Sequence, residues 1–151
     1  MLSLLRIWFD ICLWRAAPQD LPASGILLSL SLGCYALVAM LVSLGSYGLA
    51  GAIQLALLDL GLLAVFVASL LYLQGKTARI NQTLSALAGT GSLLGVVALP
   101  LVWWVQPGQQ PEQVPVFMTL LWLLLLVWHL LVMAHIIRHA LSTSLHVGLG
   151  V

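Results

Sequence analysis

Residues 49–73 read LAGAIQLALLDLGLLAVFVASLLYL, an apolar run with a single charged residue, Asp59. About 20 consecutive apolar residues are enough for a helix to cross the ~30 Å hydrocarbon core of a bilayer. We therefore predict that this stretch is a membrane-spanning helix. A charged side chain inside a bilayer costs roughly 3 kcal/mol or more, so such residues usually face a protein interior or a wet cavity. Asp59 is accordingly the first residue to consider for a functional site.

The composition of the whole chain also indicates a membrane protein. Of its 151 residues, 62% are hydrophobic and only 6% are charged, whereas soluble domains are about one quarter charged. The net charge is +1, and the Lys and Arg residues form no cluster that could bind nucleic acid. Cys12 and Cys34 are far apart and form no CxxC motif, which argues against a thiol–disulfide enzyme.

The remaining apolar runs predict an all-α integral membrane protein: a four-transmembrane-helix bundle preceded by an N-terminal interfacial amphipathic helix. The predicted spans are residues 25–46, 49–73, 82–105 and 116–137. The connection Ser46-Tyr47-Gly48 is so short that the first two spans must run antiparallel. The membrane domain is expected at residues 25–139, followed by a C-terminal tail at 140–151.

The N-terminal segment, residues 1–24, is expected to be an interfacial helix over residues 2–16 followed by a turn. The apolar run is interrupted by charges, so we do not expect a cleavable signal peptide. The helix is short for a span and is expected to lie in the membrane interface. The side chains expected at headgroup depth are Arg6, Trp8, Phe9, Trp14 and Arg15. The alternative is a helix docked against the bundle or against a partner.

The positive charges predict the orientation of the chain, because short cytoplasmic loops are enriched in Lys and Arg. All five cations lie before the first span, between the second and third spans, or after the fourth: Arg6, Arg15, Lys76, Arg79 and Arg138. The two other connections carry no Lys or Arg. Both termini are therefore expected in the cytoplasm.

Small residues predict where the helices approach closely, because helices in lipid associate through close packing rather than through the hydrophobic effect. The third span contains a GxxxG motif at Gly91 and Gly95, and the second span contains Gly61. These three glycines are predicted to lie at helix–helix contacts, either within the chain or in a homodimer.

A polar site inside the membrane is predicted around Asp59, with Gln54, Tyr35 and His129 as further candidates. His129 is about 9 Å from Asp59 in depth, so a direct pair would need a tilt or a kink. Tyr35 is expected about one turn deeper than Asp59. Three interpretations remain open: a neutral Asp59 that stabilises packing through a hydrogen bond, a proton, ion or ligand site, and an ion pair with a cation of a partner subunit.

The end of the fourth span carries a cationic cluster of His135, Arg138 and His139. No nearby carboxylate or cysteine completes a metal site, so an anionic lipid headgroup is the expected ligand. All four histidines fall in one helix and its tail, which argues against a bis-histidine haem. No metal or cofactor is therefore expected. The residues predicted at the lipid headgroups are Arg6, Arg15, Lys76, Arg79, His135, Arg138 and His139.

The chain contains no catalytic signature such as HExxH or a glycine-rich phosphate loop. The first hypothesis is a non-catalytic accessory subunit or scaffold that interacts with lipid and with other membrane proteins, or with copies of itself. The alternative is a small transporter or a proton- or ion-conducting subunit that uses Asp59. A second alternative is a quinone- or cofactor-associated subunit of a redox complex.

Two stretches resemble small bacterial inner-membrane proteins of the Yip1-like type: Pro18-Gln-Asp-Leu-Pro22 before the first span, and Gln82-Thr-Leu-Ser-Ala-Leu-Ala-Gly-Thr90 at the start of the third. The chain departs from that family in having four predicted spans rather than five and in lacking the fuller acidic–Tyr–Gly–Pro motif. The resemblance implies a non-enzymatic role in membrane organisation and trafficking.

Overall fold

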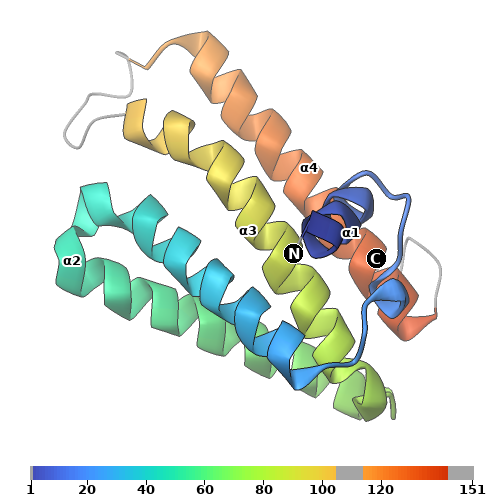
Figure 1. Cartoon of the computed structure of the whole chain (residues 1–151). Helices are drawn as coiled ribbons and strands as arrows, with labels where there is room; N and C mark the ends of the chain where they lie inside the picture. The colour runs from blue at the N-terminus through green and yellow to red at the C-terminus, as the bar shows by residue number, and fades with distance from the viewer. Residues whose placement is uncertain (1, 105–113, 143–151) are drawn as a thin grey trace.

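The computed structural model describes residues 2–104 and 114–142, and these residues form helices and connecting turns without a β-strand. Figure 1 shows a short N-terminal helix packed against a set of long helices. The elements in chain order are α1 (Leu2–Cys12), the 3-10 turn η1 (Pro18–Asp20), α2 (Gly25–Leu73), the 3-10 turn η2 (Thr77–Arg79), α3 (Ile80–Trp104) and α4 (Val116–Leu141). Three segments are long and apolar enough to cross a membrane: α2, residues 77–104 including α3, and α4.

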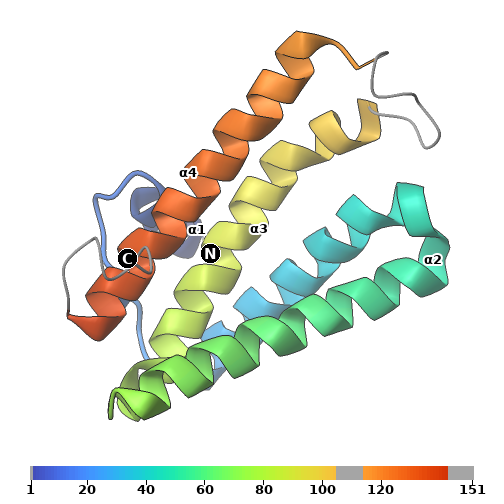
Figure 2. The same ribbon diagram turned by 180° about the vertical axis from the view of Figure 1, so that it is seen from behind.

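Helix α2 consists of two arms that meet at Gly48. Its 49 residues would extend about 74 Å as one straight helix, more than twice the hydrocarbon core. Gly48 has φ 66° and ψ 178°, a conformation that glycine adopts without the steric cost of a Cβ atom. The chain reverses there, and the two arms lie side by side (Figures 1 and 2). This break falls at the turn that the sequence predicts between residues 46 and 49.

The ends of the other long helices differ slightly from the prediction. Helix α3 begins at Ile80, two residues before the predicted span, and residue 105 lies outside the described residues. Helix α4 ends at Leu141, four residues beyond the predicted end, and Ser142 follows in the left-handed conformation. The predicted tail therefore starts too early, because residues 140 and 141 still belong to the helix.

Helix α3 is the centre of the fold. It packs against α2 on one side and against α1, η1 and α4 on the other (Figure 2). Every residue from Thr83 to Ser92 is buried, because small side chains allow neighbours to approach this half of the helix from all directions. Helix α4 packs on α3, η1 and α1, and no substantial packing of α4 on α2 occurs in the described residues. The bundle is thus open between α2 and α4.

The N-terminal helix α1 is docked against the bundle. Trp8, Ile11 and Cys12 are buried, and the Trp128 indole on α4 donates a hydrogen bond to the Cys12 carbonyl oxygen at 3.1 Å. The expectation that Trp8 lies at headgroup depth is therefore wrong, because its indole fills the space above Gly89 of α3. The alternative of a docked helix describes this segment.

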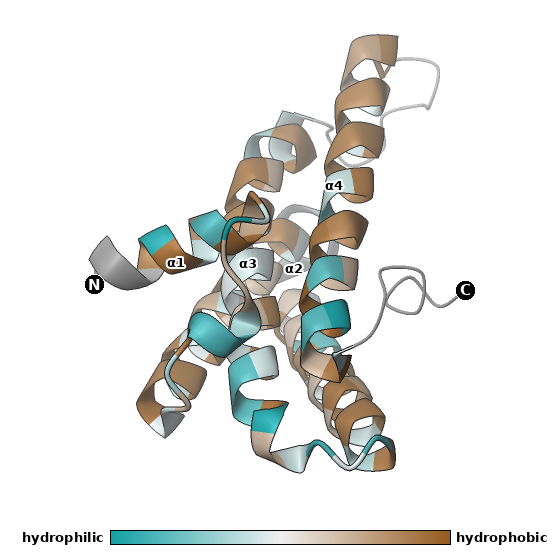
Figure 3. Cartoon of the chain, turned by 90° about the vertical axis from the view of Figure 1, so that its right-hand side faces the viewer, coloured by the Kyte–Doolittle hydropathy of each residue, from teal (hydrophilic) through white to brown (hydrophobic). Residues whose placement is uncertain are grey.

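The outer surface of the long helices is apolar. Figure 3 shows hydrophobic residues along α2 and α4, with hydrophilic ones near η1 and the end of α4. Large exposed side chains include Ile26 and Leu73 on α2 and Val116 on α4, which are 84%, 81% and 75% exposed. Soluble monomers rarely expose contiguous apolar patches of this kind. A lipid environment accounts for the pattern.

Candidate functional site

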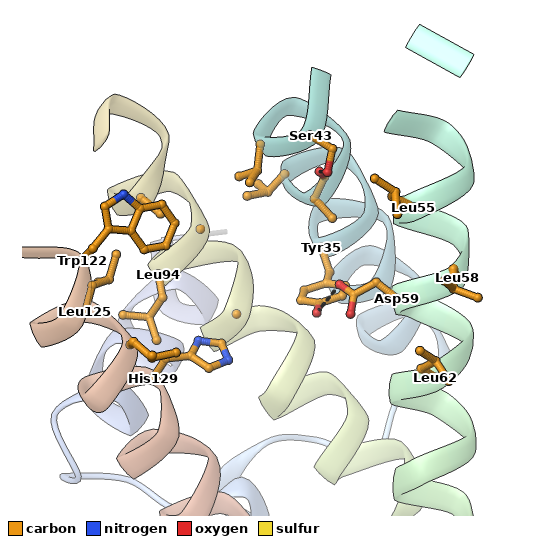
Figure 4. Close-up of a pocket in the computed structure, with 17 residues that line it drawn as sticks. Tyr35, Ser43, Leu55, Leu58, Asp59, Leu62, Leu94, Trp122, Leu125 and His129 are labelled. Carbon is orange, nitrogen blue, oxygen red and sulfur yellow. Dashed lines mark hydrogen bonds between the residues drawn. The ribbon is translucent and has the colours of Figure 1, made fainter. Parts of the chain in front are cut away.

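A cavity of about 460 Å³ lies between both arms of α2, α3 and α4, where the bundle is open. Figure 4 shows the side chains that line it. Four of them carry oxygen atoms or an imidazole: Tyr35, Ser43, Asp59 and His129. The remaining walls are mostly aliphatic, with the indole of Trp122 on the α4 side. This cavity is the candidate functional site.

Tyr35 and Asp59 form the polar centre of one wall. The Tyr35 hydroxyl donates a hydrogen bond to Asp59 Oδ2 at 2.7 Å. Tyr35 lies 13 residues before Gly48 (48 − 35) and Asp59 lies 11 residues after it (59 − 48). The reversal at Gly48 thus places them within about two residues, or 3 Å, in depth. The long tyrosine side chain spans that difference, and the bond joins the two arms of α2.

His129 lines the same cavity from α4. In Figure 4 its ring points into the cavity, toward the side that carries Asp59. No direct hydrogen bond joins the two residues, in agreement with their predicted difference in depth. Gln54 does not line the cavity, so the structure does not bring it together with the other predicted residues of the polar site. It lies on a different face of the second arm from Asp59.

The glycines of α3 shape the cavity. A Cβ atom at Gly91 would lie 2.8 Å from Tyr35 Cε2, and one at Gly95 would lie 2.5 Å from Val38 Cγ1. The GxxxG motif therefore lets the first arm of α2 approach α3 and fixes where Tyr35 lies. At Gly61, in contrast, an added Cβ atom would have no neighbouring atom within 4 Å. Gly61 therefore makes no helix–helix contact within the chain, because this face of the second arm points outward; a contact in a homodimer stays a prediction.

The hydroxyl groups near the cavity are used within their own helices. Ser43 donates to the Ala39 carbonyl oxygen at 2.9 Å, and Ser92 donates to the Ala88 carbonyl oxygen at 2.7 Å. Their donors are thus not directed at Asp59. Among these polar side chains, Asp59 and His129 are left as the groups that can interact with an occupant of the cavity.

The aromatic wall was not predicted from the sequence. Trp122, Leu125, Leu126 and His129 all line the cavity from α4, and their spacing of three and four residues places them on one helical face. That spacing is visible in the sequence. This spacing does not single out one face of α4, however, because almost every residue of the helix is apolar. Trp122 alone would be expected to face lipid or a partner.

Two cations predicted at lipid headgroups instead hold the end of α4. Lys76 Nζ donates to the Leu141 carbonyl oxygen. Arg79 Nη1 donates to the Ala140 carbonyl oxygen at 2.9 Å and to Ser142 Oγ at 2.8 Å. These bonds satisfy carbonyl groups that the helix leaves without partners, and the positive charges oppose the negative end of the helix dipole.

His135 is also a packing residue rather than a headgroup ligand. It is 4% exposed, its Nε2 lies 3.0 Å from the Ala16 carbonyl oxygen, and its ring stacks on Trp14 with the centroids 6.1 Å apart. His139 contacts the His135 ring edge to face, and Arg138 donates to His139 Nε2 at 3.0 Å. His135 thus attaches the N-terminal segment to α4, and the His139 ring packs beside it.

Arg6 and Arg15, the N-terminal cations, are exposed. Arg6 lies 4.0 Å from Asp10, one helical turn away. Both arginines remain available for the predicted contact with lipid phosphates. Among the described residues, no group of three or more His, Cys, Asp or Glu side chains could hold a metal ion.

No protein-family model, curated protein or solved structure matches the chain. The resemblance to Yip1-like proteins therefore stays a prediction. Function is inferred instead from the cavity and from the open side of the bundle.

Proposed function

We propose that the chain crosses a bacterial inner membrane four times, with both termini in the cytoplasm. The length of α2 and its reversal at Gly48 support two spans within that helix. The cations support the orientation, because Lys76, Arg79 and Arg138 lie at the same end of the bundle, where α3 begins and α4 ends. Short loops rich in Lys and Arg favour the cytoplasmic side.

The orientation can be tested with single cysteines at two exposed positions that flank opposite ends of the second arm of α2, in a chain in which alanine replaces Cys34. A membrane-impermeant maleimide should label Ser46→Cys in intact spheroplasts and Thr77→Cys only after permeabilisation. Cys12 should not react, because burial raises its pKa to about 11 and the thiolate is the reactive form. Labelling of Thr77→Cys in intact spheroplasts would contradict the orientation.

We further propose that the protein is a non-catalytic accessory subunit or scaffold, whose open side holds another component of the membrane. The observation that carries this proposal is the cavity between α2 and α4, which do not pack substantially on each other in the described residues. Leu58 and Leu62 on one side and Leu126 on the other line the cavity and are also 60%, 61% and 51% exposed. A helix pair separated by an open apolar cavity can accept a guest without first unpacking.

Photocrosslinking can test whether this side is occupied in the membrane. Leu57 and Leu58 are a matched pair: they are neighbours, both are leucines, and they are 62% and 60% exposed, but only Leu58 lines the cavity. With p-benzoylphenylalanine at each position, Leu58 should give discrete adducts with a co-purified membrane component. Leu57 should give only diffuse lipid labelling. Equal labelling at both positions would contradict a guest on the open side.

A further inference from the structure

The cavity has the size and composition of a small-molecule site. Its volume of about 460 Å³ lies within the roughly 300–1,000 Å³ of typical ligand pockets, which are mainly apolar with a few well-placed polar groups. It is also too small to enclose a whole transmembrane helix, whose diameter with side chains is about 10–12 Å over a length near 30 Å. An organic molecule of moderate size is therefore a better fit to this open cavity than a whole helix.

The polar wall selects a ligand that donates hydrogen bonds and carries positive charge. Among the described residues, Asp59 is the one acidic residue that lines the cavity. The single donor of the Tyr35 hydroxyl is already directed at Asp59 Oδ2, which orients the carboxyl group. Within residues 2–104 and 114–142, Oδ1 accepts no hydrogen bond. A carboxylate accepts hydrogen bonds and attracts cations. An anionic ligand would be repelled from this wall.

The other walls select an apolar body for the same ligand. Leu94, Leu125 and Trp122 face Asp59 across the cavity (Figure 4). Aromatic faces such as those of Tyr35 and Trp122 attract organic cations through their π electrons. Inorganic cations are disfavoured, since they need several oxygen ligands and the walls offer one carboxyl group. For a quinone, whose carbonyl groups need donors, the Tyr35 donor is already in use, and the remaining donors are the ring N–H groups of His129 and Trp122 on the α4 side, away from Asp59.

We propose that the cavity binds a lipophilic cation, an amine or quaternary onium compound with apolar or aromatic substituents, whose charged centre lies against Asp59. The ligand enters from the lipid through the opening between α2 and α4. Asp59 supplies the charge, Tyr35 holds its carboxyl group in position, and the α4 wall with Trp122 contacts the apolar body. This site needs no partner protein, so the binding of a lipophilic cation can be tested independently of the proposed accessory role.

The proposal can be tested by binding of tetraphenylphosphonium to the purified full-length protein in lipid nanodiscs. Tetraphenylborate is the control ligand, because it has nearly the same shape and the opposite charge. Saturable binding of the phosphonium is expected, and the borate should show only partition into lipid. Asp59→Asn should weaken phosphonium binding at least about tenfold. Asp10→Asn is the matched charge control, since Asp10 lies on α1 away from the cavity, and it should bind as the wild type does.

A second pair of variants tests the location without altering charge. Leu125→Trp should fill the cavity and abolish phosphonium binding, whereas Leu124→Trp, on the neighbouring face, should leave binding unchanged. Equal saturable binding of phosphonium and borate would overturn the proposal, as would unchanged binding by a monodisperse Asp59→Asn protein. Loss of binding in both tryptophan variants would place the ligand elsewhere and would also overturn it.

Discussion

A Gly89→Ala variant is expected to unfold at a markedly lower temperature than the wild type. The added Cβ atom would lie 2.3 Å from Cε2, 2.4 Å from Nε1 and 2.5 Å from Cδ2 of Trp8. These atoms belong to a rigid indole, so the clash is relieved only when α1 moves away from α3. Overpacking of this kind costs typically about 1–3 kcal/mol. Thermal unfolding in detergent, followed by circular dichroism, measures the effect.

The control for this prediction is Gly61→Ala, which places a Cβ atom where no atom lies within 4 Å. Its melting temperature should be equal or slightly higher, since alanine is favoured over glycine in a helix by up to about 1 kcal/mol. In a double-mutant cycle, Trp8→Ala should offset part of the cost of Gly89→Ala. Additive effects of Trp8→Ala and Gly89→Ala would contradict direct packing of Trp8 on Gly89.

An Arg79→Ala variant is expected to loosen the last turn of α4. The substitution removes donors to the Ala140 carbonyl oxygen and to Ser142 Oγ. A hydrogen bond that involves a charged group contributes roughly 1.5–3 kcal/mol to the stability of the folded state. The positive charge also interacts favourably with the negative end of the helix dipole. Amide hydrogen exchange should therefore become faster at residues 136–141, and the melting temperature should fall.

Arg6→Ala is the matched control for this charge removal. The Arg6 side chain is 84% exposed and lies 4.0 Å from Asp10, and exposed ion pairs of this kind contribute little. Arg79→Lys should recover only part of the stability, because lysine lacks the planar, forked donor group of arginine. If Arg6→Ala destabilised the protein as much as Arg79→Ala, general charge rather than capping would be responsible.

The helical class and the turn at Gly48 could be predicted from the sequence, because both follow from local properties: apolar runs of sufficient length, and a short uncharged glycine turn. The docking of α1 could not. Docking depends on a space on α3 that is large enough for the Trp8 indole. That space exists because residue 89, which lies 81 residues later (89 − 8), is a glycine. Nothing in the local pattern of α1 distinguishes a buried tryptophan from one at a membrane surface.

Three polar residues of the candidate site could be predicted from the sequence, but the hydrogen bond between two of them and the wall formed by α4 could not. Asp59, Tyr35 and His129 each stand out as polar groups in apolar helices. Their arrangement depends on the two-residue offset between the arms of α2 and on the reach of the tyrosine side chain, which residue counting treats as a difference in depth. Likewise, Lys76 and Arg79 are residue types that commonly bind lipid headgroups. Only the folded structure shows that they donate to carbonyl oxygens at the end of α4.

The docking of α1 halfway along α3 and α4 has a consequence for the surrounding bilayer. Large apolar side chains are exposed on α4 from Val116 to Leu130 and on α3 only from Val96 onward, whereas those on α2 extend from Ile26 to Leu73. The exposed apolar length of α4 itself is therefore about 22 Å, against about 35 Å for one arm of α2, and beyond it the lipid meets the exposed Leu5 and Phe9 of α1. We expect the bilayer to thin on the α1 side, or the protein to tilt, to reconcile these lengths. Such a deformation would favour neighbours with short hydrophobic segments on that side.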